Sequence, residues 1–140
     1  MLVQGIEHIV HGNRLLAIII RSQVTTDKKY NFLTESDNAL QLGVSNYEGG
    51  EVIPTHAHLR PEVTVRAGQE FILVNAGRLR VNLYDESTRE ALSVQDLATG
   101  DMILLVAGAH GFEVLEPCQI VEVKQGPYLS KEKDKAVWSS

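Results

Sequence analysis

The amino-acid sequence predicts an all-β protein built as an antiparallel sandwich or barrel. Short apolar runs recur along the chain, separated by turns rich in glycine, proline or acidic residues, such as Glu116-Pro117. No long segment has the 3.6-residue apolar period of an amphipathic helix. With 140 residues and 44% hydrophobic content, the chain can form one core but is short for two. We therefore expect one domain over residues 1–140.

The expected strands begin at residue 15 and end at residue 124. Each is rich in β-branched, leucine or aromatic residues and is bounded by turn residues. The runs are Leu15 to Ile20, Leu40 to Asn46, Phe71 to Val74, Leu79 to Tyr84, Met102 to Val106, Phe112 to Glu116 and Ile120 to Lys124. Short helices could form only at residues 34–39 and 130–137. The second lies in a polar tail that frays unless Val137 and Trp138 dock on a neighbour.

Alternation within residues 77–84 divides the side chains between two faces of a strand. The apolar set is expected to point into the core, and the polar set to lie on a solvated or subunit-facing side. The first set is Leu79, Val81 and Leu83, and the second is Arg78, Arg80, Asn82 and Tyr84.

Three histidines and one glutamate, from separate strand-like segments, form a candidate metal site. His56 and His58 are two residues apart, so on a strand both side chains point to one face. Glu70 opens an apolar run, and His110 follows a glycine turn. Neutral imidazole nitrogens and one carboxylate oxygen give a divalent first-row ion a mixed shell with positions open to water or substrate.

These spacings resemble the two motifs of the cupin family. The first motif is matched by Gly50-EVIPT-His56-Ala-His58 and, after a longer gap than in the family, by Glu70-FILVNA-Gly77. The second is matched by Gly100-DMILLVAGA-His110, which has valine at the family's proline, one residue fewer before the histidine and no asparagine after it. The resemblance covers roughly residues 41 to 127.

The cupin resemblance implies an antiparallel jelly-roll barrel that binds one divalent transition metal ion through His56, His58, Glu70 and His110. Iron, manganese, nickel, cobalt, zinc and copper all suit such a shell. In this reading residues 1–40 form N-terminal strands or an arm, 41–127 the barrel core and 128–140 a polar tail. The runs LQLG (40–43) and EVKQGPY (122–128) also resemble small cupins associated with polysaccharide and nucleotide-sugar biosynthesis.

Glu62 is the alternative carboxylate ligand, because its spacing from the histidines fits the motif. Glu70 is preferred, since it has the expected spacing to Gly77 and begins a buried run, whereas Glu62 follows Pro61 in a loop-like stretch.

Three further residues are candidates for substrate binding. Arg60 and Arg66 lie in the extra length between His58 and Glu70, where guanidinium groups at the barrel mouth could hold a phosphate or carboxylate. Phe112 is expected to face inward with His110 by alternation.

Composition excludes several classes of partner. A net charge of −5 and a pI near 5.5 argue against a general nucleic-acid or membrane-surface binder. Cys118 is the single cysteine, so the chain cannot form an internal disulfide. We expect Cys118 to be a small buried residue without a chemical role. The longest apolar run is far shorter than a membrane span, and no basic leader precedes an apolar stretch, so a cytoplasmic location is expected.

The strand at 15–20, outside the cupin match, is expected to need an edge for pairing and so predicts a homodimer.

The expected function is that of a metal-dependent enzyme acting on a small polar, anionic or sugar-like substrate. An isomerase, epimerase or lyase is favoured. The fold alone does not distinguish among these reactions, because one scaffold carries many chemistries. An iron-type dioxygenase and a non-enzymatic module that binds a carbohydrate or small acid are the alternatives. No residue pattern assigns a catalytic nucleophile or base.

Overall fold

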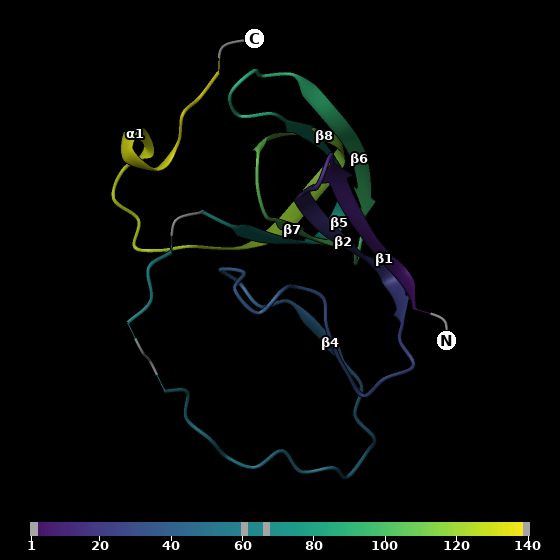
Figure 1. Ribbon diagram of the computed structural model, residues 1–140. Coiled ribbons are helices and arrows are strands. Elements are labelled where there is room, and N and C mark those ends of the chain that lie inside the picture. Colours follow the sequence, from purple (N-terminus) through teal and green to yellow (C-terminus); the bar gives the residue numbers. More distant parts are fainter. Residues whose placement is uncertain (1–2, 60–61, 66–67, 139–140) are drawn as a thin grey trace.

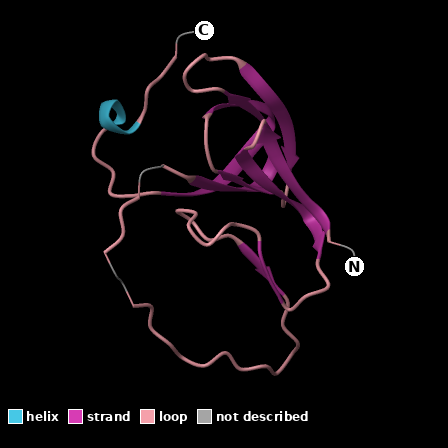
Figure 2. Ribbon diagram, in the orientation of Figure 1, coloured by secondary structure: helices cyan, strands magenta, loops and turns pink. Residues whose placement is uncertain are grey.

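The computed structural model describes residues 3–59, 62–65 and 68–138. Within these residues the chain forms strands gathered into one curled sheet, a separate two-stranded sheet and one short helix (Figures 1 and 2). The elements are β1 (Gln4–His11), β2 (Arg14–Thr25), β3 (Tyr30–Phe32), β4 (Gly43–Ser45), β5 (Glu70–Tyr84), β6 (Ala91–Ala98), β7 (Met102–Leu105), β8 (Ala109–Lys124) and α1 (Lys131–Asp134).

The main sheet has the order β1-β2-β7-β5-β6, with β8 also paired to β5, and every pair is antiparallel. Strands β3 and β4 pair only with each other among the described residues. The sheet curls into a half-barrel (Figure 1). The all-β, antiparallel prediction is therefore confirmed.

Strand β2 lies inside the main sheet and carries much of its core. Leu16 to Ile20 are at most 2% exposed, and the strand pairs with β1 on one side and β7 on the other. Residues 15–20 find the edges they were expected to need within the chain itself, so their pairing gives no support to the predicted homodimer, which stays a prediction. A continuous apolar run of this kind is typical of a strand covered on both faces.

Strands β5 and β8 each join two of the expected runs. Glycine and proline were expected to separate those runs, yet Gly77 lies inside β5 and Pro117 inside β8. The ladder between the two strands instead shifts register between Val74 and Leu79, as β-bulges allow. The two turns are therefore corners within long strands.

The predicted division of faces along β5 is confirmed for the apolar set. Leu79, Val81 and Leu83 are at most 2% exposed and belong to one core cluster, against which the partly buried Cys118 packs. On the other face, the Arg78 guanidinium lies 3.6 Å from the Glu116 carboxylate.

The corner in β5 brings the two ends of this strand together. Glu70, its first residue, pairs with Leu105 of β7, whereas Tyr84, its last, pairs with Ala109 of β8. A straight strand would separate Glu70 from Tyr84 by about 46 Å. Leu105 and Ala109 are only four residues apart, a span of at most about 14 Å. Strand β5 must therefore fold back on itself.

The remaining elements differ in detail from expectation. Strands β1, β3 and β6 lie outside the expected apolar runs, and residues 34–39 form turns and bends rather than a helix. The expected C-terminal helix is limited to the single turn α1. In the described part of the chain no helix is long and apolar enough to cross a membrane.

We predict that Gly77→Ala destabilises the protein by about 2–4 kcal/mol. Gly77 has φ +90°, and an added Cβ would overlap the Pro117 carbonyl oxygen and lie 2.8 Å from the Cys118 Cα atom. Urea unfolding measures the effect. Gly49→Ala is the control, since no atom lies within 4 Å of its added Cβ, and it should change stability by less than about 0.5 kcal/mol. Equal stability of the two variants would show that the corner tolerates a side chain.

Candidate functional site

Glu70 and His110 meet at the place where the ends of β5 converge. The His110 Nε2 atom lies 3.2 Å from the Glu70 Oε2 atom, and both side chains are partly shielded from solvent, with 31% and 17% exposed. Glu70 begins β5 on the face that also carries Ile72, whereas His110 of β8 stands opposite Leu83 near the far end of β5. The corner in β5 therefore creates this contact between distant ladder positions.

The hydrogen bond with His110 is the main reason that the pKa of Glu70 lies below the ordinary value of a glutamate. The positive charge of Lys124 acts in the same direction. Partial burial opposes them, because it disfavours the charged carboxylate. Glu70 thus remains an ionised hydrogen-bond acceptor at neutral pH.

The Glu70–His110 pair lines a cavity of about 900 Å³. This volume lies within the range of small-molecule sites, about 300–1,000 Å³. Its walls come from the start of β5, the β5–β6 turn, the start of β8 and the C-terminal segment after α1. Side chains that line it include Tyr84, Glu86, Arg89, Phe112, Lys124, Lys135 and Trp138.

Gln69 anchors the chain just before Glu70, at the edge of the cavity. Its side chain is buried, exchanges two hydrogen bonds of 2.9 Å with the Asn38 amide and accepts a third, of 3.1 Å, from the Leu40 N–H group. These bonds tie residues 38–40 to the residue that precedes Glu70. A buried amide with this many partners holds the segment in one place.

The two other predicted ligands, His56 and His58, lie on the long segment between β4 and β5. The segment extends away from the main sheet (Figure 1), and residues 56–58 form no strand. Both histidines are exposed, their ring centroids are 5.3 Å apart, and the His56 Nδ1 atom lies 2.8 Å from the Pro54 carbonyl oxygen. The expected strand is therefore absent, and Pro54 beside it lacks the N–H group that a ladder needs.

The predicted metal ligands fit one ion only in part. The 3.2 Å between the Glu70 and His110 atoms is close to the separation of two neighbouring ligands on an ion with bonds near 2.1 Å, about 3 Å. Across the described residues, however, no three histidine, cysteine or acidic side chains converge as a metal site. The structure brings together Glu70 and His110, and separately His56 and His58.

The other predicted residues are distributed as follows. Glu62 is exposed on the same long segment. Arg60 and Arg66 lie outside the described residues. Phe112 lines the cavity, and its ring centroid lies 5.2 Å from that of His110.

Sequence analysis missed three side chains of the cavity: Tyr84, Arg89 and Trp138. Tyr84 was expected on the polar face, but it lies at the end of β5 after a register shift, and the Trp138 ring packs edge-on at 5.5 Å from it. The Arg89 guanidinium lies 5.2 Å from the Trp138 ring centroid. Trp138 was the one signal in the sequence for this part of the cavity, because a tryptophan in a polar tail is stabilised by packing its ring on the rest of the protein.

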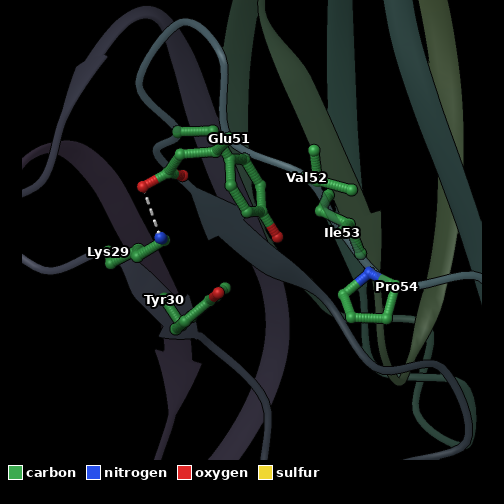
Figure 3. Close-up of a pocket in the computed structure, with 7 residues that line it drawn as sticks. Lys29, Tyr30, Glu51, Val52, Ile53 and Pro54 are labelled. Atoms are coloured by element: carbon green, nitrogen blue, oxygen red, sulfur yellow. Dashed lines mark hydrogen bonds and ion pairs between the residues drawn. The ribbon is translucent and has the colours of Figure 1, made fainter.

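A second, smaller cavity of about 330 Å³ lies beside β3 (Figure 3). There the Lys29 ammonium forms a 2.7 Å ion pair with Glu51 and lies between 5 and 6 Å from the rings of Tyr30 and Tyr47. None of the predicted site residues lines this cavity. Its one cation is already paired, so the larger cavity is the stronger candidate.

Comparison of the chain with protein-family models, with curated proteins and with solved structures found no match.

We predict that Glu70→Gln lowers the free energy of unfolding by about 1 kcal/mol at pH 6, because it removes a charged hydrogen-bond acceptor. The pKa of Glu70 is depressed in the folded state, so its contribution is complete above the ordinary value near 4.3 and is lost as pH falls through the lower folded value. Urea unfolding at pH 6 and pH 3 should show the two proteins converging in acid. Glu62→Gln, at an exposed position, should match wild type at both pH values. A Glu70→Gln deficit that persists undiminished at pH 3 would contradict the electrostatic cause.

Proposed function

We propose that this protein is an enzyme that binds a small polar or sugar-like substrate in the Glu70–His110 cavity and moves a proton there. Isomerases, epimerases and lyases share this chemistry, since each removes a proton from carbon or oxygen and returns or eliminates a group. The observation that carries the proposal is the carboxylate–imidazole contact of 3.2 Å on the wall of a cavity of about 900 Å³.

The chemistry of the pair supports proton transfer. An ionised Glu70 accepts a hydrogen bond from His110 Nε2, which leaves the other ring nitrogen of the neutral imidazole, Nδ1, as the basic atom. The same carboxylate stabilises the imidazolium that forms when Nδ1 takes a proton. Glu70 in this scheme orients His110 and His110 is the general base.

The walls of the cavity support a polar substrate with an apolar face. Phe112, Tyr84 and Trp138 provide aromatic surface, while Lys124 and Arg89 provide hydrogen-bond donors. Polar groups placed among aromatic walls fix the orientation of a small molecule.

We predict that the protein exchanges carbon-bound hydrogen of its substrate class with solvent. Aldoses, ketoses and their phosphate esters are incubated with the protein in D₂O without oxygen, and proton NMR follows the loss of the signal beside the carbonyl group. His110→Gln should slow exchange by about 10²–10⁴-fold. His11→Gln, at an exposed position of β1, is the matched control and should keep the wild-type rate.

Other outcomes of this experiment would replace the proposal. Binding without exchange for any compound would indicate a non-enzymatic carbohydrate or small-acid module. Turnover that requires and consumes oxygen would indicate the dioxygenase alternative. Equal loss in both histidine variants would remove His110 from the mechanism.

We further propose that the chain is a cupin-like jelly roll whose site takes one divalent transition metal ion. Glu70 and His110 would supply two ligands, and His56 and His58 would complete the set when the segment between β4 and β5 approaches the cavity. When bound, the ion would polarise a substrate oxygen or lower the pKa of a bound water.

We predict that Mn²⁺ or Zn²⁺ titrated into the apo-protein binds at a ratio of one ion per chain, as measured by calorimetry. Glu70→Gln and His56→Ala should each weaken binding by at least about 100-fold, since each removes a ligand. Glu62→Gln should not change the affinity. Metal should also slow amide hydrogen exchange in residues 50–58, because binding must draw that segment toward β5. Retention in Glu70→Gln with loss in Glu62→Gln would make Glu62 the ligand instead.

A further inference from the structure

Arg89 adopts a backbone conformation that arginine rarely takes. Its φ is +63°, the single positive value among the described residues other than glycine. The residue lies in the β5–β6 turn, where its N–H group donates to the Asp85 carbonyl oxygen at 2.9 Å. The Asp85 side chain accepts from the N–H groups of Ser87 and Thr88, both at 2.8 Å. The turn is thus built to hold a left-handed residue, a position that favours glycine or asparagine.

A strained backbone at a cavity wall points to a role for the side chain. Arg89 lines the larger cavity, and its guanidinium lies over the Trp138 ring at 5.2 Å. Within the described part of the chain no carboxylate forms an ion pair with it.

The charge of the cavity wall differs in sign from that of the whole chain. The chain carries a net charge of −5, but the cations on the wall are Arg89, Lys124 and Lys135. Two carboxylates also line the wall: Glu86, which is paired with Arg14, and Glu70, which is hydrogen-bonded to His110. Three cations against two carboxylates leave the wall with a net positive charge, which attracts an anion.

We propose that Arg89 and Trp138 recognise the anionic group and the ring of a sugar-sized phosphate ester. Arg89 binds the phosphate through its paired N–H donors, and the Trp138 indole, packed edge-on against Tyr84, covers an apolar face of the ring. This inference rests on the proposed function, for which it names the substrate class. The ligand then spans the cavity from the β5–β6 turn toward Glu70 and His110.

Trp138 is the only tryptophan of the chain, so intrinsic fluorescence reports directly on this site. Glucose 6-phosphate titrated into the full-length protein should change the emission with a saturable curve. Glucose has the ring without the phosphate, and inorganic phosphate has the anion without the ring. Each should bind at least 10-fold more weakly than glucose 6-phosphate. Glucose binding as tightly as its phosphate would overturn the anionic class, and no saturable change with any of the three would overturn the site.

Substitution of Arg89 by glycine separates recognition from folding. Arg89→Gly should raise the urea midpoint of unfolding, because glycine relieves the positive φ, and should weaken glucose 6-phosphate binding at least 10-fold. Arg78→Gln, which removes a cation paired with Glu116 away from the cavity, is the control and should bind as wild type. Undiminished binding by Arg89→Gly would refute the assignment.

His110→Gln distinguishes this inference from the proposed function. It should retain glucose 6-phosphate binding while it loses proton exchange. If Arg89→Gly keeps full affinity while His110→Gln still abolishes exchange, the recognition site is wrong and the enzyme proposal stands. If ligand binding depends on Arg89 but wild type exchanges no proton, the recognition site stands and the enzyme proposal fails.

Discussion

The corner at Gly77 is the constraint on which the rest of the structure depends. Strand β5 pairs with β7 and β8 at its start and with β6 and β8 at its end, so a bend in this one strand curls the whole sheet. Only glycine allows the φ of +90° together with the close approach of the Pro117 carbonyl. The corner in β8 at Pro117 faces the corner in β5, and the two strands turn as one ribbon.

The candidate site follows from that bend. In a flat ladder Glu70 and the partner of Leu83 would lie tens of ångströms apart, yet the His110 and Glu70 side chains meet at 3.2 Å. A half-buried carboxylate is costly unless it is hydrogen-bonded, and His110 supplies that bond. The same contact therefore stabilises the curl of the sheet and is the one to which we assign proton transfer.

Sequence predicted the parts of the fold that depend on local pattern. The buried face of Leu79, Val81 and Leu83 follows from alternation, and the apolar run at 15–20 marks a strand, although its place within the sheet was not evident. What could not be read is whether a glycine or proline ends a strand or bends it, since both outcomes need the same residue types. For this reason each of the long strands β5 and β8 was expected to be two shorter strands. A local pattern also cannot predict the contact between Tyr84 and Trp138, because that contact depends on where the C-terminal segment packs.

The length of chain between His58 and Glu70 allows His56 and His58 to reach Glu70 and His110, although the structure holds the two pairs apart. Gln69 is fixed by its bonds to Asn38, and His58 is eleven residues before it. An extended tether of that length spans up to about 36–40 Å. Because the anchor immediately precedes Glu70, the histidines can reach Glu70 without breaking a ladder of the main sheet. The segment from 46 to 59 has no helix or strand to unfold, so the gain in ligand bonds is opposed by backbone entropy and by any loss of the Lys29–Glu51 ion pair. If an ion is bound as proposed, it would replace the proton between Glu70 and His110 and draw this segment toward β5, while the ladders of the main sheet would stay as they are.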